Sequence, residues 1–180
     1  MRRGEMTGRE IELKKIIDAL ELPFILECPM DLYLIESAIH LLQEGGYNLG
    51  YDYQWSVMKR PKSPTLRKDL ESIDIALRMG EDESKNFELP FLSKCKTTKL
   101  RLFIKRIGRD NRLKLAWELE KLSTTIFLIR NKLALPTPED IAEKSQGKMD
   151  VDEAREALWS LDQELGICWE GKKEERKWYP

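Results

Sequence analysis

The stretch TPEDIAEKSQGKMDVDEAREALWSL, residues 137–161, decides the fold of the second half of the chain. Thr137 stands where a helix cap is expected, and Pro138 suits the first position of the helix that follows. The letters SQGK then predict a turn, because glycine and polar residues gather there. From Val151 onward apolar residues recur at helical spacing, until Gly166 ends the second helix. The stretch therefore predicts two short helices joined by a tight turn.

The neighbours of these two helices complete a familiar order. Residues 111–134 predict a long helix, because apolar side chains step there by three and four. Residues 167–169 and 176–179 predict two short strands around a charged turn. Helix, short helix, turn, helix and hairpin, over about 111–179, resembles the winged helix-turn-helix superfamily. The resemblance implies a β-hairpin wing but no single function, since winged helices bind DNA, RNA and protein partners alike.

Two shorter stretches resemble other families. The letters TPEDIAEKS, residues 137–145, are similar to the equivalent helix in the middle domain of bacterial sigma factors. The letters LECPMDLYLI, residues 26–35, are similar to the opening of kleisins, the subunits that bridge chromosome-condensing ATPases. The chain differs from kleisins in its short length and its basic middle. The second resemblance implies a bridging subunit as one alternative function.

The first half of the chain predicts helices and one strand. Thr7 and Glu10 have the spacing of a capping box, Pro29 can open a second helix, and Ser63 can cap a third. Residues 47–57 alternate aromatic with polar or small residues, which predicts a strand whose aromatic face is core or, alternatively, a surface that stacks bases. The predicted fold is mainly α, with a helical domain over 1–93, a basic connecting helix over 94–110 and a winged-helix domain over 111–180.

Composition limits the class of protein. Charged residues make up 35% of the 180 residues, well above the usual quarter, and there are only four Asn and four Gln. This balance is typical of thermophile proteins, in which ion-pair networks are favoured and thermolabile amides are avoided. No apolar run is long enough to span a bilayer, and the first residues lack the apolar core of a signal peptide. We therefore expect a cytoplasmic protein that does not bind membranes.

The net charge of −1 conceals a strong asymmetry along the chain. Residues 94–114 hold nine Lys or Arg and one acid, whereas residues 136–180 hold seven bases and twelve acids. Residues 1–50 are also acidic, with five bases and nine acids. Charge that is separated in this way indicates where partners bind rather than what the fold is.

The basic segment, residues 94–114, is the candidate for binding nucleic acid. Its cations, together with those of the predicted wing, suit the phosphate backbone of DNA or RNA and would not read its sequence. The alternative is a solvated face that balances the acidic ends of the chain. The candidate phosphate-binding residues are Lys99, Arg101, Lys105, Arg106, Arg109, Arg112 and Lys114 in the segment, and Lys172, Lys173 and Arg176 in the wing.

The acidic second helix, residues 151–165, is the candidate for binding a protein or a second copy of the chain. In DNA-reading relatives of the motif this helix enters the major groove, but here its outward carboxylates would repel phosphates. Trp159 among polar groups suits a protein-binding anchor, and the alternative is that it packs under the wing or against the first half. The candidate partner-binding residues are Asp152, Glu156, Trp159 and Gln163.

Nothing in the sequence predicts an enzyme, a cofactor or a metal site. His40 is the single histidine and lies in an apolar helix, where we expect a satisfied core or edge residue. The three cysteines lack metal or redox spacing, and no phosphate loop, dinucleotide fingerprint or nucleophile elbow is present. The sequence thus predicts a non-catalytic nucleic-acid-associated subunit or regulator. The alternatives are a protein-interaction or assembly subunit without nucleic acid, and a sequence-specific transcription regulator.

Overall fold

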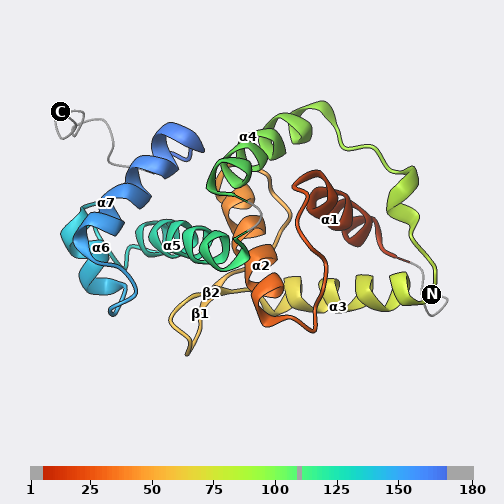
Figure 1. Ribbon diagram of the computed structural model, residues 1–180, viewed down its shortest axis with the longest axis horizontal. Helices are drawn as coiled ribbons and strands as arrows, with labels where there is room; N and C mark the ends of the chain where they lie inside the picture. Colours follow the sequence, from red (N-terminus) through yellow and green to blue (C-terminus); the bar gives the residue numbers. More distant parts are fainter. Residues whose placement is uncertain (1–5, 109–110, 170–180) are drawn as a thin grey trace.

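The computed structural model describes residues 6–108 and 111–169, and in them the chain is mainly helical, as predicted (Figure 1). A 3-10 turn, Glu83–Asn86, precedes α4, and a π-helical turn, Ser160–Glu164, extends α7. The strands β1 (Gln54–Trp55) and β2 (Pro61–Lys62) pair antiparallel. The helices are α1 (Gly8–Ala19), α2 (Pro29–Glu44), α3 (Pro64–Arg78), α4 (Phe91–Ile107), α5 (Arg112–Arg130), α6 (Pro138–Lys144) and α7 (Val151–Trp159).

Capping side chains fix the starts of the helices where the sequence predicts them. The Thr7 hydroxyl accepts a hydrogen bond from the backbone N–H of Glu10 at 3.3 Å, and the Glu10 carboxylate accepts the backbone N–H of Thr7 at 2.5 Å. The hydroxyls of Ser63 and Thr137 cap α3 and α6 in the same manner. Each cap satisfies a backbone donor that the first turn of a helix leaves unpaired.

Two predicted helix boundaries are wrong. The basic connecting helix, predicted over 94–110, begins earlier, at Phe91 directly after Pro90, and ends at Ile107. The helix predicted over 111–134 ends at Arg130, because the Lys132 backbone takes a left-handed φ of 56°. Leu133, the last of the apolar residues spaced by three and four in the predicted helix, lies beyond the end of α5 and is exposed. Side-chain periodicity alone does not report such a break in the backbone.

Residues 47–57 form no continuous strand, although their alternation is real. Tyr47, Leu49 and Tyr51 are buried and the residues between them are exposed, but only β1 pairs with another strand. The backbone of Tyr51 bonds to the side chain of Gln43 instead of to a neighbouring strand. The amide oxygen of Gln43 accepts the N–H of Tyr51 at 3.0 Å, and its amide nitrogen donates to the C=O of Tyr51 at 2.6 Å. The buried aromatic side chains belong to the core, so the alternative of a base-stacking surface is wrong for them.

The hydrophobic core crosses the predicted domain boundary at residue 111. In Figure 1, α2 stands at the centre with α5 packed against it. The first part of α5 joins the core of the N-terminal half through Leu115, Leu119 and Leu122. Its end joins a smaller core with α6 and α7 through Leu128 and Ile129. Helix α5 therefore connects the two parts of the molecule, because its first part is buried in the larger core and its end is buried in the smaller one.

The predicted wing lies mostly outside the described residues. Residues 167–169, expected as its first strand, carry no strand, and residues 176–179 lie beyond the described range. Within that range α5, α6 and α7 follow one another in the predicted order. No helix among the described residues is long and apolar enough to cross a bilayer.

Candidate protein-docking cleft

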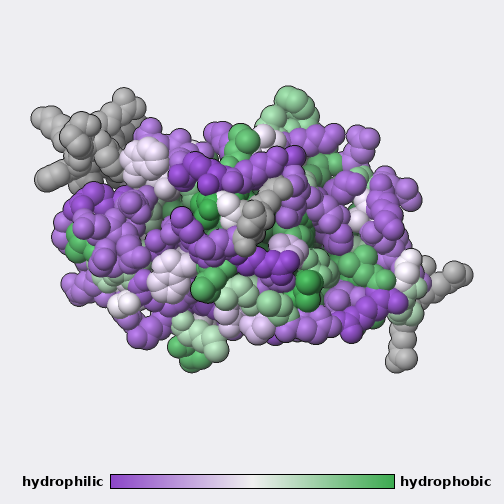
Figure 2. Space-filling view, viewed as in Figure 1, coloured by the Kyte–Doolittle hydropathy of each residue, from purple (hydrophilic) through white to green (hydrophobic). Residues whose placement is uncertain are grey.

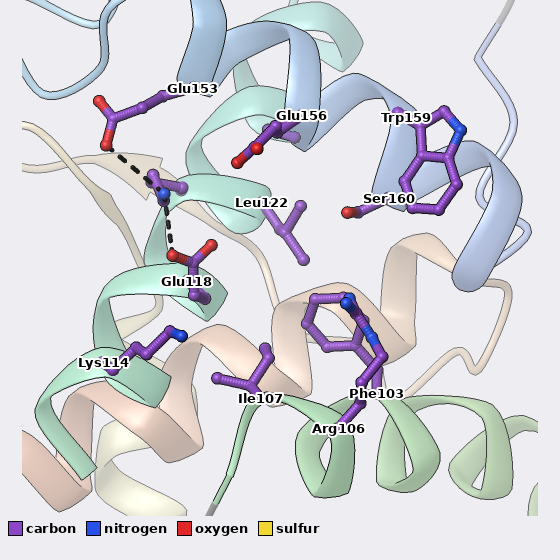
Figure 3. Close-up of a pocket in the computed structure, with 12 residues that line it drawn as sticks. Phe103, Arg106, Ile107, Lys114, Glu118, Leu122, Glu153, Glu156, Trp159 and Ser160 are labelled. Atoms are coloured by element: carbon purple, nitrogen blue, oxygen red, sulfur yellow. Dashed lines mark ion pairs between the residues drawn. The ribbon is translucent and has the colours of Figure 1, made fainter. Parts of the chain in front are cut away.

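Three helices that are distant in sequence enclose a cleft of about 280 Å³ (Figure 3). Helix α4 contributes Phe103 and Ile107 to its floor, and α5 contributes Leu122. Helix α7 closes the opposite wall through Ala157 and Trp159. The floor is thus apolar, and the charged residues that line the cleft are Arg106, Lys114, Glu118, Lys121, Glu153 and Glu156.

Helix α7 is placed by its own cap and by its inner face. The carboxylate of Asp150 accepts the N–H of Glu153 at 2.8 Å, and the Glu153 carboxylate accepts the N–H of Asp150 at 3.1 Å. Ala154 and Leu158 are buried against the end of α5. With that face turned inward, Trp159 at the end of α7 reaches the cleft.

A nearly buried lysine joins the two walls of the cleft. The Nζ of Lys121 on α5 lies 3.0 Å from the Glu118 carboxylate and 3.5 Å from that of Glu153 on α7, as the dashed lines in Figure 3 mark. A lysine with two carboxylates leaves a negative balance at this end of the cleft. This cluster was not predicted from the sequence, although the i, i+3 spacing of Glu118 and Lys121 on one helix was a usable signal.

Trp159 keeps 42% of its surface exposed. Packing against the described chain therefore covers part of the indole and leaves the rest exposed. The predicted alternative was packing under the wing or against the first half, and residues 170–180 of that wing lie outside the described range. Glu156 is exposed one turn away and lines the same cleft. Asp152 and Gln163, predicted on the same face, are exposed but do not line it. Two of the four predicted partner-binding residues thus meet at the cleft.

Acidic residues from other elements pair with the basic segment. Arg101 lies 2.7 Å from the carboxylate of Glu21, and Lys105 lies 4.0 Å from the same group. Arg106 lies 2.5 Å from Glu164, just beyond α7. These side chains are partly exposed, so each pair contributes little to stability, but together they tie α4 to its neighbours.

Three further cations of the basic segment also meet groups of the fold. Arg112 lies 3.3 Å from the fully buried carboxylate of Asp31 at the start of α2. Lys96 donates to the carbonyl of Gly46 past the end of α2, where the helix dipole favours a cation. Lys99 lies beside Gly166, just past the π-helical turn. Lys114 has no ion-pair partner among the described residues. Arg109, Lys172, Lys173 and Arg176 lie outside the described range.

Two residues from each predicted set of site residues share one surface. Arg106 and Lys114, chosen for phosphate, and Glu156 and Trp159, chosen for a protein, line one cleft. Charges that are segregated along the sequence therefore come together in space. The cleft offers an apolar floor with both signs of charge around it.

His40 is a core residue rather than a proton-transfer group. Its Nδ1 lies 2.7 Å from the hydroxyl of Ser123, and its ring lies 4.3 Å from that of Tyr53, centroid to centroid. Burial lowers the pKa of His40 to about 3, so the imidazole is neutral at physiological pH. Among the described residues no group of three or more histidines, cysteines or acids could hold a metal ion.

Comparison of the chain with protein-family models, with curated proteins and with solved structures gave no match.

Proposed function

We propose that this chain is a protein-binding subunit of a larger assembly and that the cleft between α4, α5 and α7 is its docking site. The observation that carries the proposal is the half-exposed Trp159 above an apolar floor ringed by charges. Tryptophan in a recessed, desolvated position is the side chain most enriched among residues that dominate protein interfaces. The resemblance of the α5–α7 region to winged helices supports the same role, because that fold also serves as a protein-binding module.

The charges around the cleft suit a protein better than a nucleic acid. Glu118, Glu153 and Glu156 would repel phosphates, and Arg106 is already paired with Glu164. A protein partner can present acids and bases together and so match both signs. Such matching contributes specificity, while the apolar floor and the indole contribute affinity.

Removal of the indole tests the docking role. We expect Trp159→Ala to weaken binding of the native partner at least tenfold, by loss of buried contact area. The control is Leu102→Ala, which removes an exposed side chain of α4 that does not line the cleft. The chain is purified under native conditions, and its partner is then purified and titrated against both variants. The proposal is contradicted if the chain purifies without a bound protein, or if the partner binds the Trp159 variant as tightly as it binds the unaltered chain.

Phosphate binding by the basic segment is a second proposal, supported by one observation. The described part of residues 94–114 holds eight bases, and the carboxylates paired with them number four: Glu21, Asp31, Glu88 and Glu164. The surplus of positive charge is what a backbone contact requires. An assembly subunit can carry such a contact beside its docking cleft.

Charge reversal tests this second proposal. We expect Arg101→Glu, Lys105→Glu and Arg106→Glu together to abolish salt-sensitive binding of a short duplex or single strand, followed by fluorescence anisotropy. Lys114→Glu, which breaks no described ion pair, is the companion variant. It should lower the slope of log binding constant against log salt concentration by about one, the share of a single phosphate contact. Binding that is unchanged by both variants removes nucleic acid from the function.

A further inference from the structure

Helix α5 carries a buried threonine hydroxyl that no described residue satisfies. Thr124 is fully buried, and its Oγ1 has no hydrogen-bond partner in the part of the chain that the structure describes. A threonine in a helix can donate to the carbonyl one turn earlier, as Thr98 of α4 does to Lys94 at 2.7 Å, but Thr124 makes no such bond. Native proteins pair nearly all buried hydroxyls with protein groups or ordered water. The hydroxyl of Thr124 therefore requires a partner from outside the chain.

Thr124 lines a small cavity between α5 and the turn that precedes α7. In Figure 1 α6 and α7 form one end of the molecule, and Figure 2 shows a mostly hydrophilic surface there. Polar side chains also prevail in the lining of the cavity. The lining residues are Trp117, Glu120, Lys121 and Thr124 of α5, and Lys148 and Met149 of the turn.

The charges around this cavity are paired within the fold. Lys148 forms an ion pair with Glu120, which joins the turn to α5. The Nζ of Lys121 lies 3.0 Å from the Glu118 carboxylate and 3.5 Å from that of Glu153. Two ammonium groups thus face three carboxylates, so the cavity has no surplus of positive charge to hold an anion. Each ammonium group has three N–H donors, and these ion pairs leave donors for a further acceptor.

The size of the cavity decides the class of ligand. Its volume is about 10 Å³. A cavity needs about 10–15 Å³ to hold one water molecule, and a buried water makes about three hydrogen bonds to polar groups around it. A larger ligand does not fit, and the described residues offer no group of acids, histidines or cysteines that could hold a metal ion. Water fits the volume, accepts an N–H from a lysine and bonds to a hydroxyl.

We propose that this cavity is a binding site for one ordered water molecule, bonded to the hydroxyl of Thr124 and to the ammonium groups of the lining. The water connects α5 to the turn that ends in Asp150, the cap of α7. Lys121 also lines the docking cleft, so the water supports the wall that α7 forms there. The inference goes beyond the docking role and stands even if the cleft binds no partner.

The variant Thr124→Val tests the site, because valine has nearly the same shape as threonine and lacks the hydroxyl. With the water in place, the variant loses a buried hydrogen bond, and the midpoint of urea unfolding should fall. Without the water, valine would replace an unpaired buried hydroxyl, and the midpoint would rise. A midpoint that is unchanged or higher therefore overturns the proposal.

Thr125→Val is the matched control. Thr125 is equally buried on the same helix, but its hydroxyl lies 3.7 Å from the Sδ of Met149, a weak acceptor. The unfolding midpoint of this variant should fall less than that of Thr124→Val. An equal fall in both variants would assign the loss to valine in α5 and would also overturn the proposal.

A high-resolution crystal structure of the full-length chain observes the water directly. We expect one peak of electron density within hydrogen-bonding distance of Thr124 Oγ1 and of a lysine Nζ. The same peak should be retained in the Thr125→Val variant and weakened or lost in Thr124→Val. Absence of density beside Thr124 Oγ1 in the unaltered chain contradicts the site.

Discussion

His40 shows how a single buried residue ties stability to pH. The unfolded chain binds a proton at His40 near pH 6.5, whereas the folded chain binds it only near pH 3. The unfolded state therefore holds more protons in this window, and acid favours unfolding. The carboxylate of Glu44 lies 3.6 Å from Nε2 and also pairs with Arg130 at 3.1 Å, and burial raises the pKa of this carboxyl.

We expect the free energy of unfolding to fall by about 1.4 kcal/mol for each pH unit below 6.5, as protonation of His40 is suppressed only in the folded state. Urea unfolding from neutral pH down to about pH 5.5 measures it, because exposed carboxyl groups titrate lower. The variant His40→Gln, which can still bond to Ser123, should lose this dependence. An equal slope in both proteins would show that another group is responsible.

The buried pair of Glu36 and Arg60 predicts a second effect of single residues. Arg60→Met leaves the Glu36 carboxylate buried and unpaired, which should cost about 3–5 kcal/mol of unfolding free energy. Replacement of both residues by Met should recover most of the lost unfolding free energy, since two apolar side chains pack without a desolvation penalty. Arg67→Met, which breaks an exposed pair with Glu71, is the control and should cost about 0–1 kcal/mol. Denaturant midpoints decide between these outcomes.

At the scale of one element, α7 depends on its capping box. Asp150→Ala removes the side-chain acceptor for Glu153 N–H and should cost about 1 kcal/mol of stability. Because α7 forms one wall of the cleft, we also expect weaker binding of whatever docks there. Asp152→Ala, an exposed acid in the same turn, is the matched control. Equal losses in both variants, measured by thermal unfolding, would contradict a specific role of the cap.

At the scale of the whole molecule, α5 should make the two cores unfold together. Leu119→Ala creates a cavity in the larger core and should cost about 2–5 kcal/mol. Hydrogen exchange should then accelerate in both α1 and α6, since α5 packs on both sides. Leu113→Ala, exposed on the same helix, is the control. Acceleration in one half alone would show that the halves unfold separately.

Local signals in the sequence predicted the helices well, because caps and prolines act within a few residues. Thr7, Ser63 and Thr137 each cap the helix that the sequence assigned to them. The end of α5 was not predictable, because the left-handed turn at Lys132 has no glycine to announce it. The strand over 47–57 was mistaken because alternation reports burial on one side and does not report a pairing partner.

The candidate site could be predicted only in parts. Trp159 and Glu156 were identified from the helical face they share, but their neighbours Phe103 and Leu122 lie on other helices and need the fold. The pairing of Arg101 with Glu21 was equally hidden, because a charge run in sequence says nothing of the acids that fold against it. Electrostatic patterns along a chain thus limit the possible partners, and the tertiary structure decides which charges remain available.

The ion pairs that tie α4 to its surroundings have a consequence for heat tolerance. Arg101, Arg106 and Arg112 each join α4 or the start of α5 to a different element. Hydration of charged groups becomes less favourable as water warms, so the free energy needed to strip water from such pairs declines. Hydrophobic stabilisation per unit area levels off over the same range. The ion pairs in the cationic middle of the chain would then contribute a growing share of the folding stability, relative to the hydrophobic core, as the temperature rises.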